Sequence, residues 1–310
     1  MNTPSSRRTL AVLWLGMLLA SPAAAQEMTN PADQRVGHTR PAQADSLTDA
    51  VSASTRIYEM PTVNVHAQRL SPLREEGRVG AYAQPRWTAH RRFGQTRVYV
   101  MPEGVMEFEY WLLPKFSQHG HGIEELGVQY EAGFGLPHRF QLDLYSVSHK
   151  EGREGPMSFD EQKVELRWAI ADWDVVPANP TLYLEWIGIS EAPDHLEGKL
   201  LLGGELATRW HWGTNLVFEH EMGGAQENSN ELTAGASYTV ADAAFSLGAE
   251  TKLALVDTRE NRGDYSREYL VGPSFQCDPL RRMHIDLVPL FGVTHAAPRA
   301  AVTAVLGWEF

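Results

Sequence analysis

Carboxylates dominate the charged residues between Val105 and Phe310, where 31 Asp and Glu stand against 15 Lys and Arg, a net charge of −16. Many of them alternate with apolar side chains, so a β-strand would gather them on one face. Carboxylates that crowd into a low-dielectric space repel one another unless they are paired, hydrated or bound to cations. We therefore expect one acidic interior surface, formed by Glu107, Glu109, Glu125, Glu131, Asp143, Glu165, Glu185, Glu205, Glu219, Glu221, Glu231, Glu250 and Asp286.

Residues 66–104 have the opposite charge, with seven arginines, three glutamates and no lysine, a net charge of +4. A guanidinium group is the best-matched partner for a carboxylate because its planar fork donates two parallel hydrogen bonds. We hypothesise that this Arg-rich segment folds into the acidic interior, or across its mouth, as a plug. The alternative is a solvated basic linker, with the interior acids paired to cations of their own strands. The candidate plug arginines are Arg69, Arg74, Arg78, Arg86, Arg91, Arg92 and Arg97.

The elements that would position these side chains are amphipathic strands. In one segment Val164, Leu166 and Trp168 alternate with Glu165 and Arg167. Such segments of about ten residues are typical of strands that cross a membrane as part of a barrel. Twelve segments fit the pattern, near residues 105–116, 123–135, 138–148, 162–173, 180–189, 198–207, 212–222, 231–240, 243–256, 266–276, 282–294 and 299–310.

The connections between these segments alternate between long polar loops and tight turns. This pattern, with an even strand number, is typical of an outer-membrane barrel whose two ends lie in the periplasm. The sequence therefore predicts an all-β fold, a transmembrane antiparallel up-and-down β-barrel of about 12 strands. Ten or fourteen strands are alternatives, because Arg97 to Met101 also alternates weakly. A soluble barrel would place its polar faces outside, whereas here Trp, Tyr and Phe gather near the ends of the apolar faces, as in aromatic girdles.

The last strand reads AAVTAVLGWEF and ends at Phe310. It resembles the closing strand of bacterial outer-membrane β-barrels, in which a terminal aromatic residue is the signal to the barrel-assembly machinery. The segments from Gln84 to Phe93, Gly135 to Leu144, Asn179 to Trp186 and Arg209 to Gly213 are similar to a group of uncharacterised outer-membrane proteins. The Gly-Leu-x-x-Arg-Phe turn that starts at Gly135 is also similar to MetA-like barrels associated with aromatic degradation. These resemblances imply the fold, an outer-membrane location and Phe310 as the assembly signal, and they imply no cargo.

The N-terminus predicts export. Arg7 and Arg8 precede an apolar run, and Ala23 to Ala25 form a small-residue cleavage site, so residues 1–25 are expected to be a signal peptide. Residues 26–56 lack periodicity and predict a disordered periplasmic leader. Residues 57–104 are expected to form the Arg-rich periplasmic, plug-like segment, and residues 105–310 the barrel. Cys277 is the only cysteine, so no intramolecular disulfide can form.

An acidic lumen favours cations and neutral or basic solutes, so we expect an outer-membrane channel or transporter for small solutes. A non-conducting structural or adhesive barrel is the alternative. A third possibility is an outer-membrane phospholipase. This enzyme would need a serine beside an outward-facing histidine, for which His220 is the obvious candidate, or beside the His284–Asp286 pair expected on the inward face. No sequence pattern indicates a cofactor, a metal site or a catalytic residue, and the negative charge argues against nucleic acid. The expected partners are membrane lipid, the assembly machinery and small solutes; the oligomeric state is left open.

Overall fold

The computed structural model describes residues 73–118, 122–152 and 154–310. All of them belong to one compact unit, Ala67–Phe310. The expected signal peptide, the leader and Arg69 lie outside the described residues. Among the described residues, no helix is long and apolar enough to cross a membrane.

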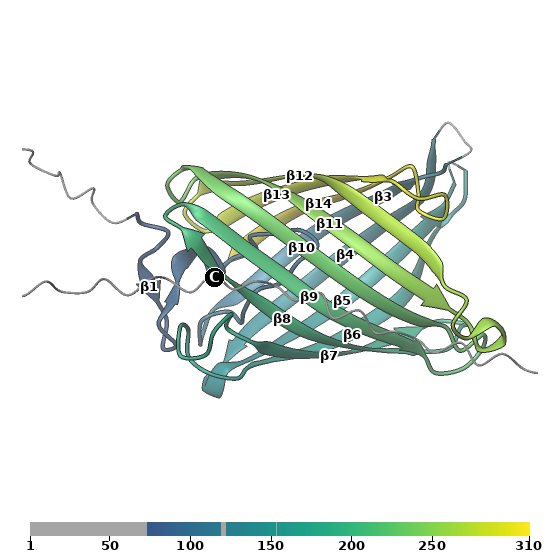
Figure 1. The fold of residues 1–310 in the computed structure, drawn as a ribbon, viewed down its shortest axis with the longest axis horizontal. Helices are drawn as coiled ribbons and strands as arrows, with labels where there is room; N and C mark the ends of the chain where they lie inside the picture. The colour runs from purple at the N-terminus through teal and green to yellow at the C-terminus, as the bar shows by residue number, and fades with distance from the viewer. Residues whose placement is uncertain (1–72, 119–121, 153) are drawn as a thin grey trace, which may run out of the picture. The chain divides into compact units, whose positions relative to one another are not determined.

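Twelve antiparallel strands form a closed barrel, in which each strand is hydrogen-bonded to its neighbours in sequence and β14 returns to pair with β3 (Figure 1). This confirms the expected all-β barrel of about 12 strands. The strands are β3 (Met106–Phe116), β4 (Ile123–Leu136), β5 (Phe140–Glu151), β6 (Met157–Ala169), β7 (Thr181–Ile189), β8 (His195–Ala207), β9 (Trp210–Glu221), β10 (Asn228–Ala241), β11 (Phe245–Asp257), β12 (Ser266–Leu280), β13 (Met283–Gly292) and β14 (Ala300–Glu309).

The two ends of the barrel differ in their connections. At one end, which we call the turn end, short connections join the strands, including the 3-10 turn η2 (Pro137–Arg139) and the pair Thr208 and Arg209. The C-terminal Phe310 also lies at this end. The opposite end, which we call the loop end, carries longer connections such as the one containing η3 (Arg259–Asn261).

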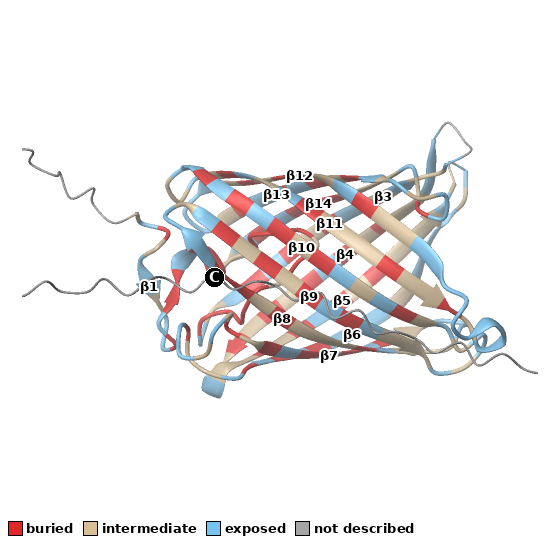
Figure 2. Ribbon diagram, in the orientation of Figure 1, coloured by how far each residue is buried: buried red, intermediate tan, exposed pale blue. Residues whose placement is uncertain are grey.

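Side chains alternate between the two faces of the barrel wall, as Figure 2 shows in the alternating colours along each strand. In β7, for example, Tyr183 and Glu185 are buried, whereas Leu182 and Leu184 are exposed. The outward face is almost entirely apolar. Most of its exposed aromatic residues lie near the turn end, at Phe108, Trp168, Trp210, Tyr238 and Trp308, or near the loop end, at Phe159, Trp186, Phe218 and Phe291, whereas Tyr130 lies near the middle of β4.

One predicted segment was displaced along the chain. The sequence predicted a strand near 162–173, whereas β6 is Met157–Ala169. The apolar pattern of the sequence continues past the end of β6 to Trp173, although Trp173 is not in a strand. An apolar ring occurs there because it is buried at the mouth of the barrel against Trp87 and Tyr99. The weak alternation from Arg97 to Met101 also does not form a strand. The count therefore remains twelve.

The described chain before the barrel begins at the turn end with a short hairpin, β1 (Arg78–Val79) and β2 (Gln84–Pro85), followed by the 3-10 turn η1 (Arg86–Thr88). Residues 86–101, which we call the inner segment, lie inside the barrel and are enclosed by its wall (Figure 1). An apolar cluster forms there between the chain and the wall, from Tyr82, Trp87, Phe93, Val98, Tyr99, Val100, Ala169 and Trp173. This cluster anchors the segment whose polar groups form the site described next.

Candidate functional site

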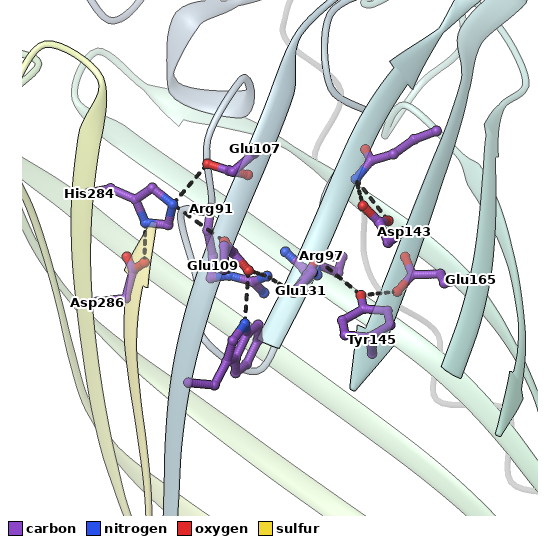
Figure 3. A network of polar contacts seen from close by, with 12 residues as sticks. Arg91, Arg97, Glu107, Glu109, Glu131, Asp143, Tyr145, Glu165, His284 and Asp286 are labelled. Atoms are coloured by element: carbon purple, nitrogen blue, oxygen red, sulfur yellow. Dashed lines mark hydrogen bonds and ion pairs between the residues drawn. The ribbon is translucent and has the colours of Figure 1, made fainter. Parts of the chain in front are cut away.

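A polar network joins the inner segment to the first strands of the barrel (Figure 3). Arg91 donates from Nε to Glu109 Oε1 at 2.9 Å and from a second nitrogen to Glu109 Oε2. It also reaches Glu131 Oε2 at 3.2 Å. Its guanidinium carbon lies 4.1 Å from the centroid of the Trp111 ring, a cation–π geometry. The side chains of Arg91 and Glu109 are each 1% exposed, so this is a fully buried, bidentate ion pair.

Arg97 extends the network along the wall. It donates to both oxygens of Glu131, at 3.0 and 3.3 Å. The Tyr145 hydroxyl lies within hydrogen-bond distance of Glu131 and of Glu165 and can donate its single proton to either. Arg167 pairs with Glu165 and, at 3.2 Å, with Asp143. Carboxylates and guanidinium groups thus alternate across β3, β4, β5 and β6, so each buried charge has an opposite charge beside it.

Arg92 points to the other side of the barrel from its neighbour Arg91. It donates to Ser237 at 2.9 Å, to Thr239 at 2.6 Å and to His211 Nδ1 at 2.9 Å. Because arginine only donates, His211 must accept through an unprotonated nitrogen. Burial lowers the pKa of Arg92, and this effect is partly offset by Glu75 at 3.4 Å. Arg91 and Arg92 therefore bind opposite walls.

The backbone of the inner segment is hydrogen-bonded by side chains of the wall, because residues 89–101 belong to no sheet or helix that would satisfy their own groups. Glu250 accepts from the amides of Gly94 and Gln95 at 2.9 and 2.8 Å. Gln141 accepts from the amide of Met101 at 2.7 Å, and Gln276 donates to the carbonyl of Arg91 at 2.6 Å. These partners come from β5, β11 and β12, so the segment is bound on several sides.

A row of glycines makes room for the inner segment. Gly203 of β8 pairs with Gly213 of β9, which pairs with Gly235 of β10. A Cβ added to Gly213 would lie 2.9 Å from Val98 Cγ2, and one added to Gly235 would lie 2.7 Å from Phe93 Cδ1. The wall is therefore flat where the apolar side chains of the segment rest on it.

The other plug candidates that the structure describes, Arg74, Arg78 and Arg86, lie at the turn end. The Arg74 amide donates to Asp242 at 2.8 Å, and Arg78 forms an exposed ion pair with Asp174 at 2.6 Å. Arg86 lines a cavity of about 630 Å³ together with Arg74, Arg92 and Arg281. Of the six plug arginines within the described residues, Arg91, Arg92 and Arg97 are the ones whose guanidinium groups bind side chains of the inner wall.

The thirteen acidic candidates divide into two groups. Eight surround the inner segment or its immediate partners: Glu107, Glu109, Glu131, Asp143, Glu165, Glu205, Glu250 and Asp286. The other five lie toward the loop end: Glu125, Glu185, Glu219, Glu221 and Glu231. In this second group Lys115 pairs with Glu125 at 3.1 Å and Lys252 with Glu231 at 2.9 Å. The other three have different partners: the Tyr183 hydroxyl donates to Glu185, His195 lies 2.6 Å from Glu219, and the Glu227 amide donates to Glu221.

Sequence reasoning missed several members of the site. Glu197 is buried and pairs with Lys199 at 2.6 Å, but the predicted strand began one residue after it. The alternation of β8 could have revealed it, since Glu197 shares the inward face with Lys199. Asn215, Gln141 and Gln276 were not singled out, because a neutral amide on an inward face carries no charge pattern.

The histidines considered for catalysis have other partners. His220 Nδ1 lies 2.7 Å from Asn228 Oδ1. His284 lies 2.6 Å from Asp286 and 2.9 Å from Glu107. Within residues 73–118, 122–152 and 154–310, none of the hydrogen bonds of these two rings reaches a serine, so this geometry gives no reason to assign a serine nucleophile.

No protein family and no curated protein matches the sequence. Among solved structures, the chain is similar to an outer-membrane channel from Pseudomonas putida F1, with 9% identity, a TM-score of 0.48, and coverage of 69% of this chain and 98% of that one. It is also similar to the NanC porin, with 10% identity, a TM-score of 0.45 and coverage of 66% and 98%. For the KdgM porin the values are 7%, 0.44, 66% and 98%. The function therefore has to be argued from the side chains of this barrel.

Proposed function

We propose that the chain spans the outer membrane as a channel for small solutes, closed by its inner segment. A membrane location is supported by the outward face, whose exposed leucines lie between two groups of exposed aromatic residues. A closed barrel satisfies every backbone hydrogen bond of its wall, which lipid requires. In this proposal residues 1–25 direct export, and Phe310, which is 60% exposed at the end of β14, is the signal to the assembly machinery.

The observation that carries the closure is the buried ion pair between Arg91 of the inner segment and Glu109 of the wall. Removing one partner of a buried ion pair costs about 3–5 kcal/mol, because the other charge is left uncompensated. The inner segment is thus held in the lumen by a small number of ion pairs with the wall. A conformational change or a charged solute can replace these ion pairs and release the segment. This favours a gated channel over a permanently open one.

The proposed selectivity is for cations and for neutral or basic solutes. Toward the loop end the inward face carries Glu125, Glu185, Glu197, Glu219 and Glu231. Lys115, Lys199 and Lys252 neutralise part of this charge. The net field remains acidic, so anions are disfavoured.

The test is single-channel conductance of the mature chain in a planar lipid bilayer. We expect brief, infrequent openings from the unmodified protein and long cation-selective openings from a variant carrying Arg91→Ala and Arg97→Ala. Arg78→Ala is the matched control, because its ion pair with Asp174 is exposed. Heat-shifted gel mobility checks that each barrel is folded.

Two outcomes contradict the proposal. Identical conductance of the unmodified and double-variant proteins would show that the inner segment does not close the lumen. Absence of current from both folded proteins would favour the alternative, a non-conducting structural barrel. The hydrogen bonds of the inner segment to several strands also fit that alternative.

A further inference from the structure

A second cluster of ionisable side chains lies where the inner segment meets β3, β13 and β14. Two groups of side chains there have their potential ligand atoms within 4.8 Å of one another. One group is His90, Glu107 and Glu309, and the other is Glu107, Glu109 and His284. Glu107 belongs to both, so a single carboxylate has a histidine on either side. The His90 and His284 rings are 6.2 Å apart between centroids.

His284 is held as a metal-ligating histidine is usually held. Its Nδ1 lies 2.6 Å from Asp286 Oδ2, which leaves Nε2 directed at Glu107 Oε1 at 2.9 Å and near Glu109 Oε1 at 3.4 Å (Figure 3). A carboxylate behind the imidazole fixes its tautomer and frees the other nitrogen for a metal. Gly307 of β14 leaves the space for this ring, since any Cβ at that position would overlap Nε2.

His90 supplies the second imidazole. Its Nδ1 is buried and lies 2.6 Å from Glu309 Oε1, yet this contact lacks the angles of a hydrogen bond. This nitrogen is therefore available to an ion, although the two atoms have to separate to the spacing of roughly 3.3 Å that two tetrahedral zinc ligands have. The second oxygen of Asp286, a residue only 2% exposed, is likewise without a hydrogen-bond partner.

When both imidazoles are neutral, as metal binding requires, the charges of the cluster are not balanced by its own cations. Arg91 already pairs with Glu109. Glu107, Glu309 and Asp286 are left beside two imidazoles. A divalent ion supplies the missing positive charge. Imidazole with carboxylate ligands suits zinc and related transition metals, whereas calcium and magnesium prefer oxygen ligands alone.

We propose that this cluster binds a divalent transition-metal ion, represented by Zn²⁺. His90, Glu107 and His284 are the ligands, Glu309 completes the set, and Asp286 orients His284. Zinc–nitrogen bonds are about 2.0–2.1 Å, so the two rings, whose centroids are 6.2 Å apart, have to move toward each other for both to bind one ion. The ligands come from the inner segment and three strands, and for this reason their spacing in the sequence matches no known metal motif. Since His90 is the ligand from the inner segment, the ion would tie that segment to the wall, a consequence that rests on the proposed channel function.

The experiment is isothermal titration of the metal-stripped mature chain in detergent micelles with ZnCl₂, together with the visible absorption spectrum after Co²⁺ is added. We expect one ion per chain and a tetrahedral Co²⁺ spectrum. His90→Ala and His284→Ala should each weaken binding at least tenfold. His220→Ala is the matched control, since His220 bonds to Asn228 on the outward face, and it should bind as the unmodified protein does.

His90→Ala also keeps the test independent of folding, because His90 is not part of the barrel wall. Absence of stoichiometric binding, or binding unchanged in both His90→Ala and His284→Ala, would overturn the site. Conductance is then measured with and without Zn²⁺. If zinc binds as expected but leaves conductance unchanged, the metal site stands and the ion does not control closure by the inner segment; closure itself is tested by the Arg91→Ala and Arg97→Ala variant.

Discussion

Arg97 and Asn215 are joined by two hydrogen bonds that run in opposite directions. The Arg97 amide donates to Asn215 Oδ1 at 2.9 Å, and Asn215 Nδ2 donates to the Arg97 carbonyl at 2.7 Å. The side-chain amide of a β9 residue thus replaces the neighbouring strand that residue 97 lacks. Both backbone groups of this partly buried residue are satisfied by one side chain.

Asn215→Leu keeps the volume of the side chain but leaves the Arg97 amide and carbonyl unpaired. Each unsatisfied buried group costs about 1–3 kcal/mol. We expect peptides that cover residues 90–100 to exchange their amide hydrogens faster, measured by mass spectrometry, while the strands stay protected. Asn230→Leu is the control, because Asn230 is exposed. Equal protection in both variants would mean that the pair does not hold the segment.

Gly213→Val tests the flat wall beneath the inner segment. The added methyl groups would overlap Val98 and Thr96, whose Cγ2 atoms lie 2.9 and 3.1 Å from the position of a Cβ. Overpacking of this kind costs about 1–3 kcal/mol, and the segment is the part that can move. We expect longer openings in bilayer recordings.

Gly198→Val is the matched control for this change. A Cβ at Gly198 would approach nothing closer than the Tyr183 carbonyl, at 3.9 Å. Longer openings in this control as well would assign the effect to the strand rather than to crowding of the segment.

Leu184→Arg tests the membrane-facing surface. Leu184 is 53% exposed in the middle of β7. An arginine at the bilayer midplane costs about 2–4 kcal/mol, and the cost falls to about 0–1 kcal/mol near the interface. The free energy of unfolding from lipid vesicles, measured by denaturant titration, should fall by that amount. Leu206→Arg, near the turn end, should change it far less; equal losses would contradict the assigned membrane position.

Glu75 predicts a pH dependence at the turn end. Burial raises the pKa of this carboxyl, Asp242 adds to the effect, and Thr239 and Arg92 act against it. His211, at 3.9 Å, also faces it. Because the folded pKa lies above the ordinary value of 4.5, the folded state takes up the proton more readily. Its stabilising effect is complete below pH 4.5 and is lost as the pH rises through the raised pKa.

Glu75→Gln imitates the protonated form. At pH 7 we expect its thermal unfolding midpoint to equal or exceed that of the unmodified protein, and the difference should vanish as the pH falls below the raised pKa. Glu76→Gln controls for loss of a neighbouring carboxylate. A lower midpoint for Glu75→Gln at pH 7 would show that the charge pair with Arg92 outweighs burial.

The barrel could be predicted because its signal is local. Val164, Leu166 and Trp168 against Glu165 and Arg167 define a strand and both of its faces without knowledge of any neighbour. The end of β6 could not be predicted in this way. Trp173 continues the apolar pattern, but its amide donates to the Tyr82 carbonyl, from a residue far away in the sequence.

The inner segment was harder to predict because it has no period of its own. Arg91 and Arg92 carry the same charge as Arg74 and Arg78, and nothing in the sequence separates the buried pair from the exposed one. Their different fates depend on which wall residues stand opposite, and that is set by the register of strands more than a hundred residues apart.

The ring of strands has one joint, where β14 pairs with β3 and Glu309 stands opposite Glu107. Residues 90–95 bridge this joint from inside, since Arg91 binds Glu109 of β3, and His90 and Gln95 contact Glu309 and Thr303 of β14. The joint can form only when the last strand has been made, and pairing across so long a separation is slow. The inner segment precedes both strands in the sequence and is already available to contact them. We expect a chain that lacks the inner segment to pair β14 with β3 more slowly.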